Sequence, residues 1–172
     1  MLGNLRSDSF GVRYMSNAIL TKGMVTGLVG GLLATIVIDL VVVGVFPLMG
    51  MPADISFSII GDTAAGFFVL FGMAIAGGVP LGLVVHYLTG ISLGVIFGAV
   101  VSRSDSLRVD SMKKGAGLGI LYTEIISMPI LATAPVILQM TMSSAAQWFG
   151  VSFVMHLVYG MVLGIVVRSR TE

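Results

Sequence analysis

The chain has 172 residues, of which 56% are hydrophobic and only 10% are charged. A soluble domain carries roughly 25% charged residues, so this composition indicates an integral membrane protein. The net charge of +1, without any basic stripe, gives no indication of a nucleic-acid partner. The sequence contains no cysteine, which excludes disulfides, thiolate metal sites and cysteine nucleophiles.

Taken in chain order, the first element is a polar segment at residues 1–22. Its mixed polarity predicts a short cytoplasmic surface helix or a frayed tail rather than a cleavable signal. Residues 23–172 predict a four-span transmembrane domain, because four stretches reach the roughly 20 apolar residues that cross a bilayer. The spans are expected at about 24–48, 79–102, 115–138 and 148–167.

A fifth apolar stretch, residues 63–78, is barely long enough to cross a bilayer. Its interpretation depends on the nine Lys and Arg residues, which fall only in residues 6–22, 103–114 and 168–170. Basic segments stay in the cytoplasm, so two crossings are needed before the 103–114 loop and two after it. We therefore expect residues 63–78 to form a re-entrant or interfacial helix, or to extend the second span. Both termini are expected in the cytoplasm of a prokaryotic cell.

The chain has two histidines, and each begins the pattern His-x-x-x-Gly-x-x-x-Gly. The pattern occurs as HYLTGISLG from His86 and as HLVYGMVLG from His156. Residues four apart share a helix face, so each pattern predicts a glycine stripe that lets another helix pack closely. The predicted packing residues are Gly90, Gly94, Gly98, Gly160 and Gly164. Because both patterns would run in the same direction, they favour an all-α four-helix bundle built from two parallel helical-hairpin repeats.

Four ionisable residues lie within the expected spans: Asp39, His86, Glu124 and His156. Charges at membrane depth cost several kcal/mol unless they are paired, which makes these residues candidates for function. Depth along each span, at about 1.5 Å per residue, favours an Asp39–His86 pair and a Glu124–His156 pair. We interpret the histidines as hydrogen-bonding groups between helices.

Three other interpretations of the same residues stay open. All four side chains could hold one metal ion, the two histidines could hold a haem, or the polar residues could line a proton or solute pathway. The sequence has no tight ligand cluster and no hydrolase, P-loop or dinucleotide motif. We therefore expect no catalytic residue, no cofactor and no metal.

One resemblance covers residues 22–168. The first span ends in a turn with Pro47, Gly50 and Pro52, an Asp-Ile pair follows, and the last span reads His-Leu-x-Tyr-Gly-x-x-Leu-Gly. This arrangement resembles a widespread family of uncharacterised four-span membrane proteins, akin to the YagU-type inner-membrane proteins of bacteria and their archaeal relatives. The resemblance supports the four-span fold and implies no reaction.

The sequence favours a non-catalytic accessory subunit of a larger membrane complex, for example a membrane oxidase or monooxygenase. The expected partners are the lipid bilayer and either other membrane subunits or further copies of the chain. The alternative is a small oligomeric transporter or channel that uses Asp39, Glu124, His86 and His156 within the membrane.

The topology gives a first testable prediction. A reporter inserted in the 103–114 loop, which holds four basic residues, should be found on the cytoplasmic side because basic loops resist translocation. Reporter activity on the external face would contradict the arrangement of four spans with both termini inside.

Overall fold

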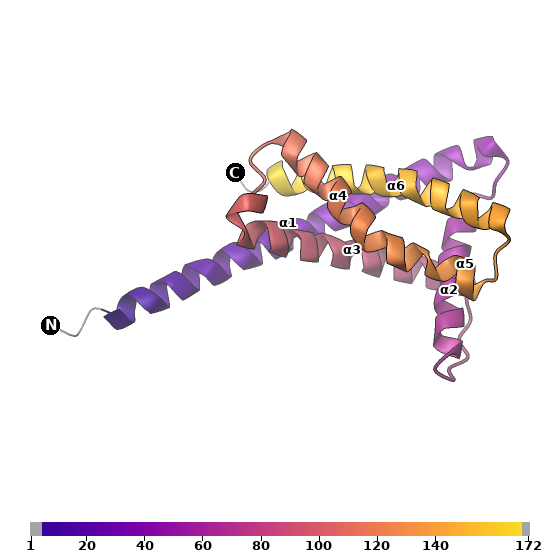
Figure 1. Cartoon of the computed structure of the whole chain (residues 1–172), viewed down its shortest axis with the longest axis horizontal. Helices are drawn as coiled ribbons and strands as arrows, with labels where there is room; N and C mark the ends of the chain where they lie inside the picture. Colours follow the sequence, from indigo (N-terminus) through magenta and orange to yellow (C-terminus); the bar gives the residue numbers. More distant parts are fainter. Residues whose placement is uncertain (1–4, 170–172) are drawn as a thin grey trace.

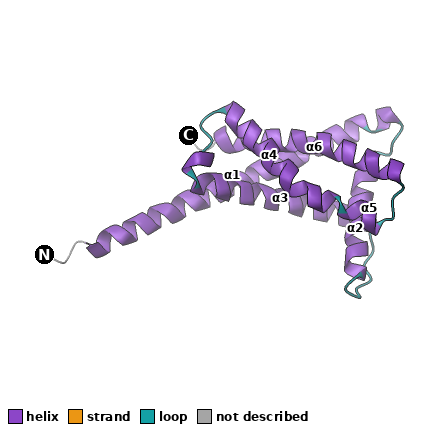
Figure 2. Cartoon of the chain, viewed as in Figure 1, coloured by secondary structure: helices purple, strands orange, loops and turns teal. Residues whose placement is uncertain are grey.

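The computed structural model describes residues 5–169, and side chains are described from residue 17 to residue 168. No residue between 5 and 169 belongs to a strand, so the described chain is all-α (Figure 2). The elements are α1 (Leu5–Val45), η1 (Pro47–Met49), α2 (Ile55–Val69), α3 (Gly78–Arg103), η2 (Asp105–Leu107), α4 (Met112–Leu131), α5 (Thr133–Ile137) and α6 (Met142–Ser169).

Among the described residues, four helical segments are long and apolar enough to cross a membrane. They are Asn17–Met49, Gly78–Arg103, Met112–Ile137 and Met142–Arg168. The chain is therefore a small multi-pass membrane protein, as the composition predicts. The helix α1 continues without a break through the predicted boundary at residues 22 and 23, and its N-terminal part extends away from the other helices (Figure 1). No proline interrupts this stretch, so the backbone hydrogen bonds of the span continue toward the N-terminus.

The short apolar helix lies earlier in the chain than residues 63–78, where the sequence predicts it. The helix α2 spans Ile55–Val69, and most of residues 70–77 form turn or loop. Gly72 and Gly78 have φ angles of 76° and 75°, in the left-handed region that glycine tolerates, and these two residues bracket the loop before α3. In Figure 1, α2 runs steeply across one end of the other helices.

Close backbone contacts at glycine join the helices in two pairs. In the first pair, Gly23, Gly27 and Gly31 of α1 face Gly98, Gly94 and Gly90 of α3. A Cβ atom added to Gly94 would lie 2.7 Å from the Cα of Gly31, which is closer than real Cβ contacts. In the second pair, Gly115 and Gly119 of α4 face Gly164 and Gly160 of α6. The predicted glycine stripes thus lie where two backbones meet, and they allow the close approach on which helix association in lipid depends.

The two pairs join mainly through α1 and α6, while α3 and α4 make few contacts. The apolar core that joins them lies toward the end of the bundle where η2 and the C-terminus lie (Figure 1). Its members include Phe97, Val101, Tyr159, Leu163 and Val167. The helices α2 and α5 lie at the opposite end.

Leucine at two of the paired glycines tests this packing. Gly94→Leu and Gly164→Leu should each lower the free energy of unfolding by roughly 1–3 kcal/mol, because the new side chain must push two backbones apart. Thermal unfolding in detergent, followed by circular dichroism, measures the effect. Gly117→Leu is the matched control on α4, since a Cβ atom at Gly117 meets no atom within 4 Å. Equal melting profiles for all three variants would contradict the packing role of Gly94 and Gly164.

Candidate functional site

A cavity of about 420 Å³ lies between the helix pairs, within the half of the bundle that holds α2 and α5. Each of the helices α1 to α6 contributes to its wall, and most of the lining side chains are apolar. Three of the lining residues are ionisable: Asp39 from α1, His86 from α3 and His156 from α6. The hydroxyl-bearing residues of the wall are Ser56, Thr63, Thr89, Ser127, Thr133 and Ser152. Three of the four candidate residues from the sequence therefore meet in one cavity.

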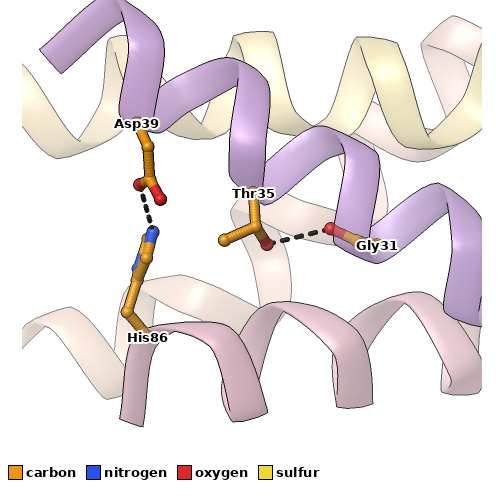
Figure 3. Close-up of polar contacts among 4 residues, drawn as sticks. All are labelled: Gly31, Thr35, Asp39 and His86. Carbon is orange, nitrogen blue, oxygen red and sulfur yellow. Dashed lines mark hydrogen bonds and ion pairs between the residues drawn. The ribbon is translucent and has the colours of Figure 1, made fainter. Parts of the chain in front are cut away.

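Asp39 and His86 form the hydrogen-bonded pair that their depth in the spans predicts. The Oδ1 atom of Asp39 lies 2.9 Å from the Nε2 atom of His86 (Figure 3). The two side chains are only 15% and 19% exposed, so the pair joins α1 to α3 away from solvent. The His86 ring also packs edge-on against Phe57 of α2, with the ring centroids 5.6 Å apart. One turn before Asp39, the Thr35 hydroxyl donates to the carbonyl of Gly31 at 2.9 Å. This hydroxyl therefore does not donate to the Asp39 carboxylate.

His156 lies in the wall of the same cavity, but its environment differs. Its Nδ1 atom is buried and has no hydrogen-bond partner among the described residues. Beside it, a second space of about 50 Å³ is lined by both histidines together with Thr35, Thr89 and Tyr159. The hydrogen bond between helices that the sequence predicts for each histidine is confirmed for His86, while the Nδ1 atom of His156 has no such bond among the described residues.

The predicted Glu124–His156 pair is also wrong. Both carboxylate oxygens of Glu124 are buried without a hydrogen-bond partner in the described part of the chain, and Glu124 does not line the cavity. The face of α4 that meets α6 carries Gly115, Gly119 and Thr123. Glu124 is one residue further on and is therefore rotated by about 100° from this face. Depth along a span gives the height of a residue and says nothing about the face on which it lies.

The structure does not bring all four candidate residues together. Between residues 17 and 168, no group of three or more His, Cys, Asp or Glu side chains could hold a metal ion. Asp39 and His86 supply one carboxylate oxygen and one ring nitrogen to each other, and the smaller space is lined by His86 and His156 but not by Asp39. This arrangement can bind a polar group, or accept and release a proton, in an otherwise apolar cavity.

The glycine contacts explain why only one histidine has an acidic partner. Gly27 contacts Gly94 in the first helix pair as Gly115 contacts Gly164 in the second. Twelve residues after Gly27 the chain has Asp39, and twelve residues after Gly115 it has Ser127. The hydroxyl of Ser127 donates to the carbonyl of Thr123 at 2.6 Å, on its own helix. Ser127 of the second pair therefore occupies the position that Asp39 occupies in the first pair, so His156 has no carboxylate at this position.

Two tyrosines, Tyr159 and Tyr122, form hydrogen bonds between the two helix pairs. Tyr159 is not among the site residues that the sequence predicts. The Tyr159 hydroxyl donates to the carbonyl of Gly90, and the Tyr122 hydroxyl donates to the carbonyl of Leu93 at 3.0 Å. Tyr159 follows His156 by three residues, a spacing that places both on one helix face. This spacing was the signal in the sequence that could have identified Tyr159.

Trp148 of α6 lines the cavity. Its indole is held by a hydrogen bond to a backbone carbonyl that has no partner within its own helix because of a proline. Its Nε1 donates to the carbonyl of Leu131 at 3.1 Å. In a continuous helix this carbonyl would accept from the residue four positions later, but that residue is Pro135, which has no backbone N–H. The indole therefore has a fixed place in the cavity wall.

Comparisons with known proteins identify no relative: no family model, no curated protein and no solved structure matches the chain. The resemblance noted from the sequence stays a prediction. Function is therefore inferred from the geometry of the cavity.

A double-mutant cycle tests the Asp39–His86 pair. Asp39→Asn combined with His86→Phe should show a coupling energy of about 0.6 kcal/mol, and at most about 1.7 kcal/mol, which is the range for polar pairs within membranes. The measurement is reversible unfolding in mixed detergent micelles. The matched cycle of Asp39→Asn with His156→Phe should give a coupling energy near zero, because His156 does not bond to Asp39. Equal coupling in both cycles would contradict the pairing.

Proposed function

We propose that the protein is a small membrane transporter that binds its solute in the cavity between the helix pairs and catalyses no reaction. The observation that carries this proposal is the cavity itself, whose wall brings Asp39, His86 and His156 together within the spans. Ionisable residues in such positions are costly and face the interior or a cavity, as they do along substrate and ion pathways. Glu124, which the sequence includes in the pathway, lies outside the cavity wall and has no part in the proposal.

The form of the cavity favours a carrier over a channel. Toward the end of the bundle that holds η2, the core residues Phe97, Leu163 and Val167 are almost fully buried and fill the space between the helices. The glycine contacts close the remaining gaps between paired helices. In alternating access, one half of a transporter moves against the other, so that the binding site opens to each side of the membrane in turn. A site that is closed toward one end of the bundle corresponds to one of these two states. Four spans are few for such a protein, so we propose that it acts as an oligomer.

We further propose that the two helix pairs are parallel repeats that arose by duplication. Supporting this are the two His-x-x-x-Gly-x-x-x-Gly patterns and the matching glycine contacts of α1 with α3 and of α4 with α6. The common position of Thr35 and Thr123, each eight residues after a contact glycine and each fully buried, also supports it. The proposed placement in the membrane keeps both termini and the basic 103–114 loop in the cytoplasm.

The second candidate is an accessory subunit of a membrane complex. A specific observation favours it: α4 with α5 is the least covered of the spans, with 22% of its most apolar stretch buried against 33% in the other three. Leu121 and Ile125 on α4 are more than half exposed, so this face is available to lipid or to another subunit. Purification in a mild detergent tests this candidate, since an accessory subunit should migrate together with other chains.

Labelling of a cysteine in the cavity tests transport without knowledge of the solute. The chain has no cysteine, so Ser152→Cys introduces one thiol, on a side chain that lines the cavity. In a transporter this thiol should react with a small membrane-impermeant thiosulfonate added to either side of sealed vesicles, because both sides gain access in turn.

The controls are Ser106→Cys, within η2, and Ser143→Cys, near the start of α6, both exposed. Each should react from one side only, and the two should react from opposite sides. Reaction of Ser152→Cys from a single side would contradict transport and would favour the accessory subunit.

A further inference from the structure

We propose that the cavity opens sideways into the bilayer, through a mouth between α2 and α4, and that it takes the hydrocarbon chain of a membrane lipid. The inference rests on the proposed solute cavity and adds to it the class of the solute and the route by which it enters. It depends on the helix contacts around the cavity, on the exposure of the side chains that line it, and on the depth of the mouth in the membrane.

The helices around the cavity are joined closely on most sides and loosely between α2 and α4. Glycine contacts hold α1 to α3, α4 to α6 and α2 to α3, and α1 packs along α6. The Tyr122 hydroxyl of α4 donates to the carbonyl of Leu93 on α3 at 3.0 Å. Nearer the other end, α2 meets α5, where a Cβ atom added to Gly66 would lie 2.3 Å from the Ile137 side chain. Otherwise α4 makes few contacts with α2 or α3 among the described residues, so this is the side on which the cavity can open.

Two large side chains on this side line the cavity and are also exposed. Phe67 of α2 is 48% exposed and Ile130 of α4 is 49% exposed. Thr133, the first residue of α5, lines the cavity and is exposed as well. The other lining residues face the same cavity but are buried or partly buried, so the cavity alone does not account for the exposure of these three. We therefore place the rim of the mouth at Phe67, Ile130 and Thr133.

The surface beside the mouth is apolar and carries no charge. The Phe67 ring lies 5.2 Å from the Phe71 ring, and Leu70 and Phe71 are 73% and 66% exposed. The sequence has no Asp, Glu, Lys or Arg from residue 63 to residue 102 or from residue 125 to residue 167. The end of α2 and the loop after it project past the neighbouring helices in Figure 1. Exposed apolar patches mark contacts with a membrane or with another protein, and the position of this one beside four spans favours the membrane.

The depth of the mouth places it among acyl chains. The span Met112–Ile137 has 26 residues, so it is about 39 Å long at 1.5 Å per residue, whereas the hydrocarbon core of a bilayer is about 30 Å thick. A span centred in the bilayer therefore extends about 5 Å beyond the core at each end. Ile130 precedes the end of this span by seven residues, or about 10 Å along the helix axis. The mouth is therefore level with lipid hydrocarbon.

Inside the mouth, the wall suits a hydrocarbon chain. Its volume of about 420 Å³ lies within the range of roughly 300–1,000 Å³ that is typical of sites for small organic molecules. Most of its polar side chains already bond within the protein: Asp39 with His86, and the hydroxyls of Thr63, Ser127 and Thr133 with carbonyls three or four residues earlier. A hydrocarbon chain needs no hydrogen bond, so it fills this wall without breaking any of them. Three hydroxyls of the wall have no such bond in the described chain, those of Ser56, Thr89 and Ser152.

Photolabelling from the lipid tests the mouth. The full chain is placed in vesicles of phosphatidylcholine that carries a diazirine in the middle of one acyl chain, and light converts the diazirine to a carbene that inserts into nearby C–H bonds. Mass spectrometry then locates the label. We expect label at Val42 and Ser152, which line the cavity but are only 5% and 8% exposed. Ala34 and Leu163 lie on the same two helices, are fully buried and do not line the cavity, so they should carry none.

A variant at the rim tests the position of the mouth. Ile130→Ala widens the proposed mouth, so it should raise the label at Ser152 relative to that at Leu40, a residue of α1 that is 69% exposed and lies outside the cavity wall. Ile126→Ala is the matched control. Ile126 lies one turn earlier on α4 and is 41% exposed, but it does not line the cavity, so the ratio should stay at its wild-type value.

Several outcomes would overturn the inference. Label at exposed residues such as Leu40 but not at Val42 or Ser152 would mean that lipid does not enter. Equal label at Leu163 would mean that the bundle opens in general, and equal ratios in the two variants would mean that the mouth lies elsewhere.

A water-soluble diazirine carboxylate, applied to the same vesicles, separates failure of this inference from failure of the proposed function. If only this reagent labels Val42 and Ser152, the cavity opens to water, and the solute cavity stands without the lipid route. If neither reagent labels them, and Ser152→Cys reacts from one side only, the proposed transport is overturned as well. Label from the lipid together with one-sided reaction of Ser152→Cys would support the lipid route and contradict transport.

Discussion

The close approach of paired helix backbones at glycine is the constraint on which the rest of this structure depends. In lipid, helices are not driven together by the hydrophobic effect, so their association relies on dense packing and a few polar contacts. Gly27 against Gly94, and Gly115 against Gly164, fix both the distance between two helices and the rotation of each. Once this rotation is fixed, residues at multiples of four positions further along α1 also face the interior. Asp39 is one of them, which is why a carboxylate in an apolar span meets His86 rather than lipid.

The cavity exists because the close glycine contacts and the apolar core fill only one end of the bundle. The glycine pairs and the core around Phe97 and Leu163 fill the end of the bundle that holds η2. Toward the other end, α4 gives way to the short α5, because Pro135 supplies no backbone N–H to continue the helix. The steeply placed α2 covers this end instead, resting on α3 through Gly61 and Gly82. The space that these elements enclose is the part of the molecule in which a ligand and the polar side chains can meet.

The two halves are similar in packing and different in chemistry. A buried threonine follows the contact glycines in each half, at Thr35 and Thr123, but Asp39 in one half corresponds to Ser127 in the other. The His86 imidazole is therefore bonded to a carboxylate, whereas the Nδ1 atom of His156 is buried without a partner among the described residues. The two imidazoles that line the cavity therefore have different surroundings.

The sequence by itself determined the membrane class, the four long apolar helices and the height of each ionisable residue, because apolar length and position along a span can be counted directly. Its depth estimate also yielded the Asp39–His86 pair. Only the tertiary structure decided which face each residue occupies. It turned Glu124 away from His156, placed the short helix at Ile55–Val69, and brought Tyr159 and Trp148 to the site. The physical reason is that rotation about a helix axis is set by the partner helix, and a shift of one residue turns a side chain by about 100°.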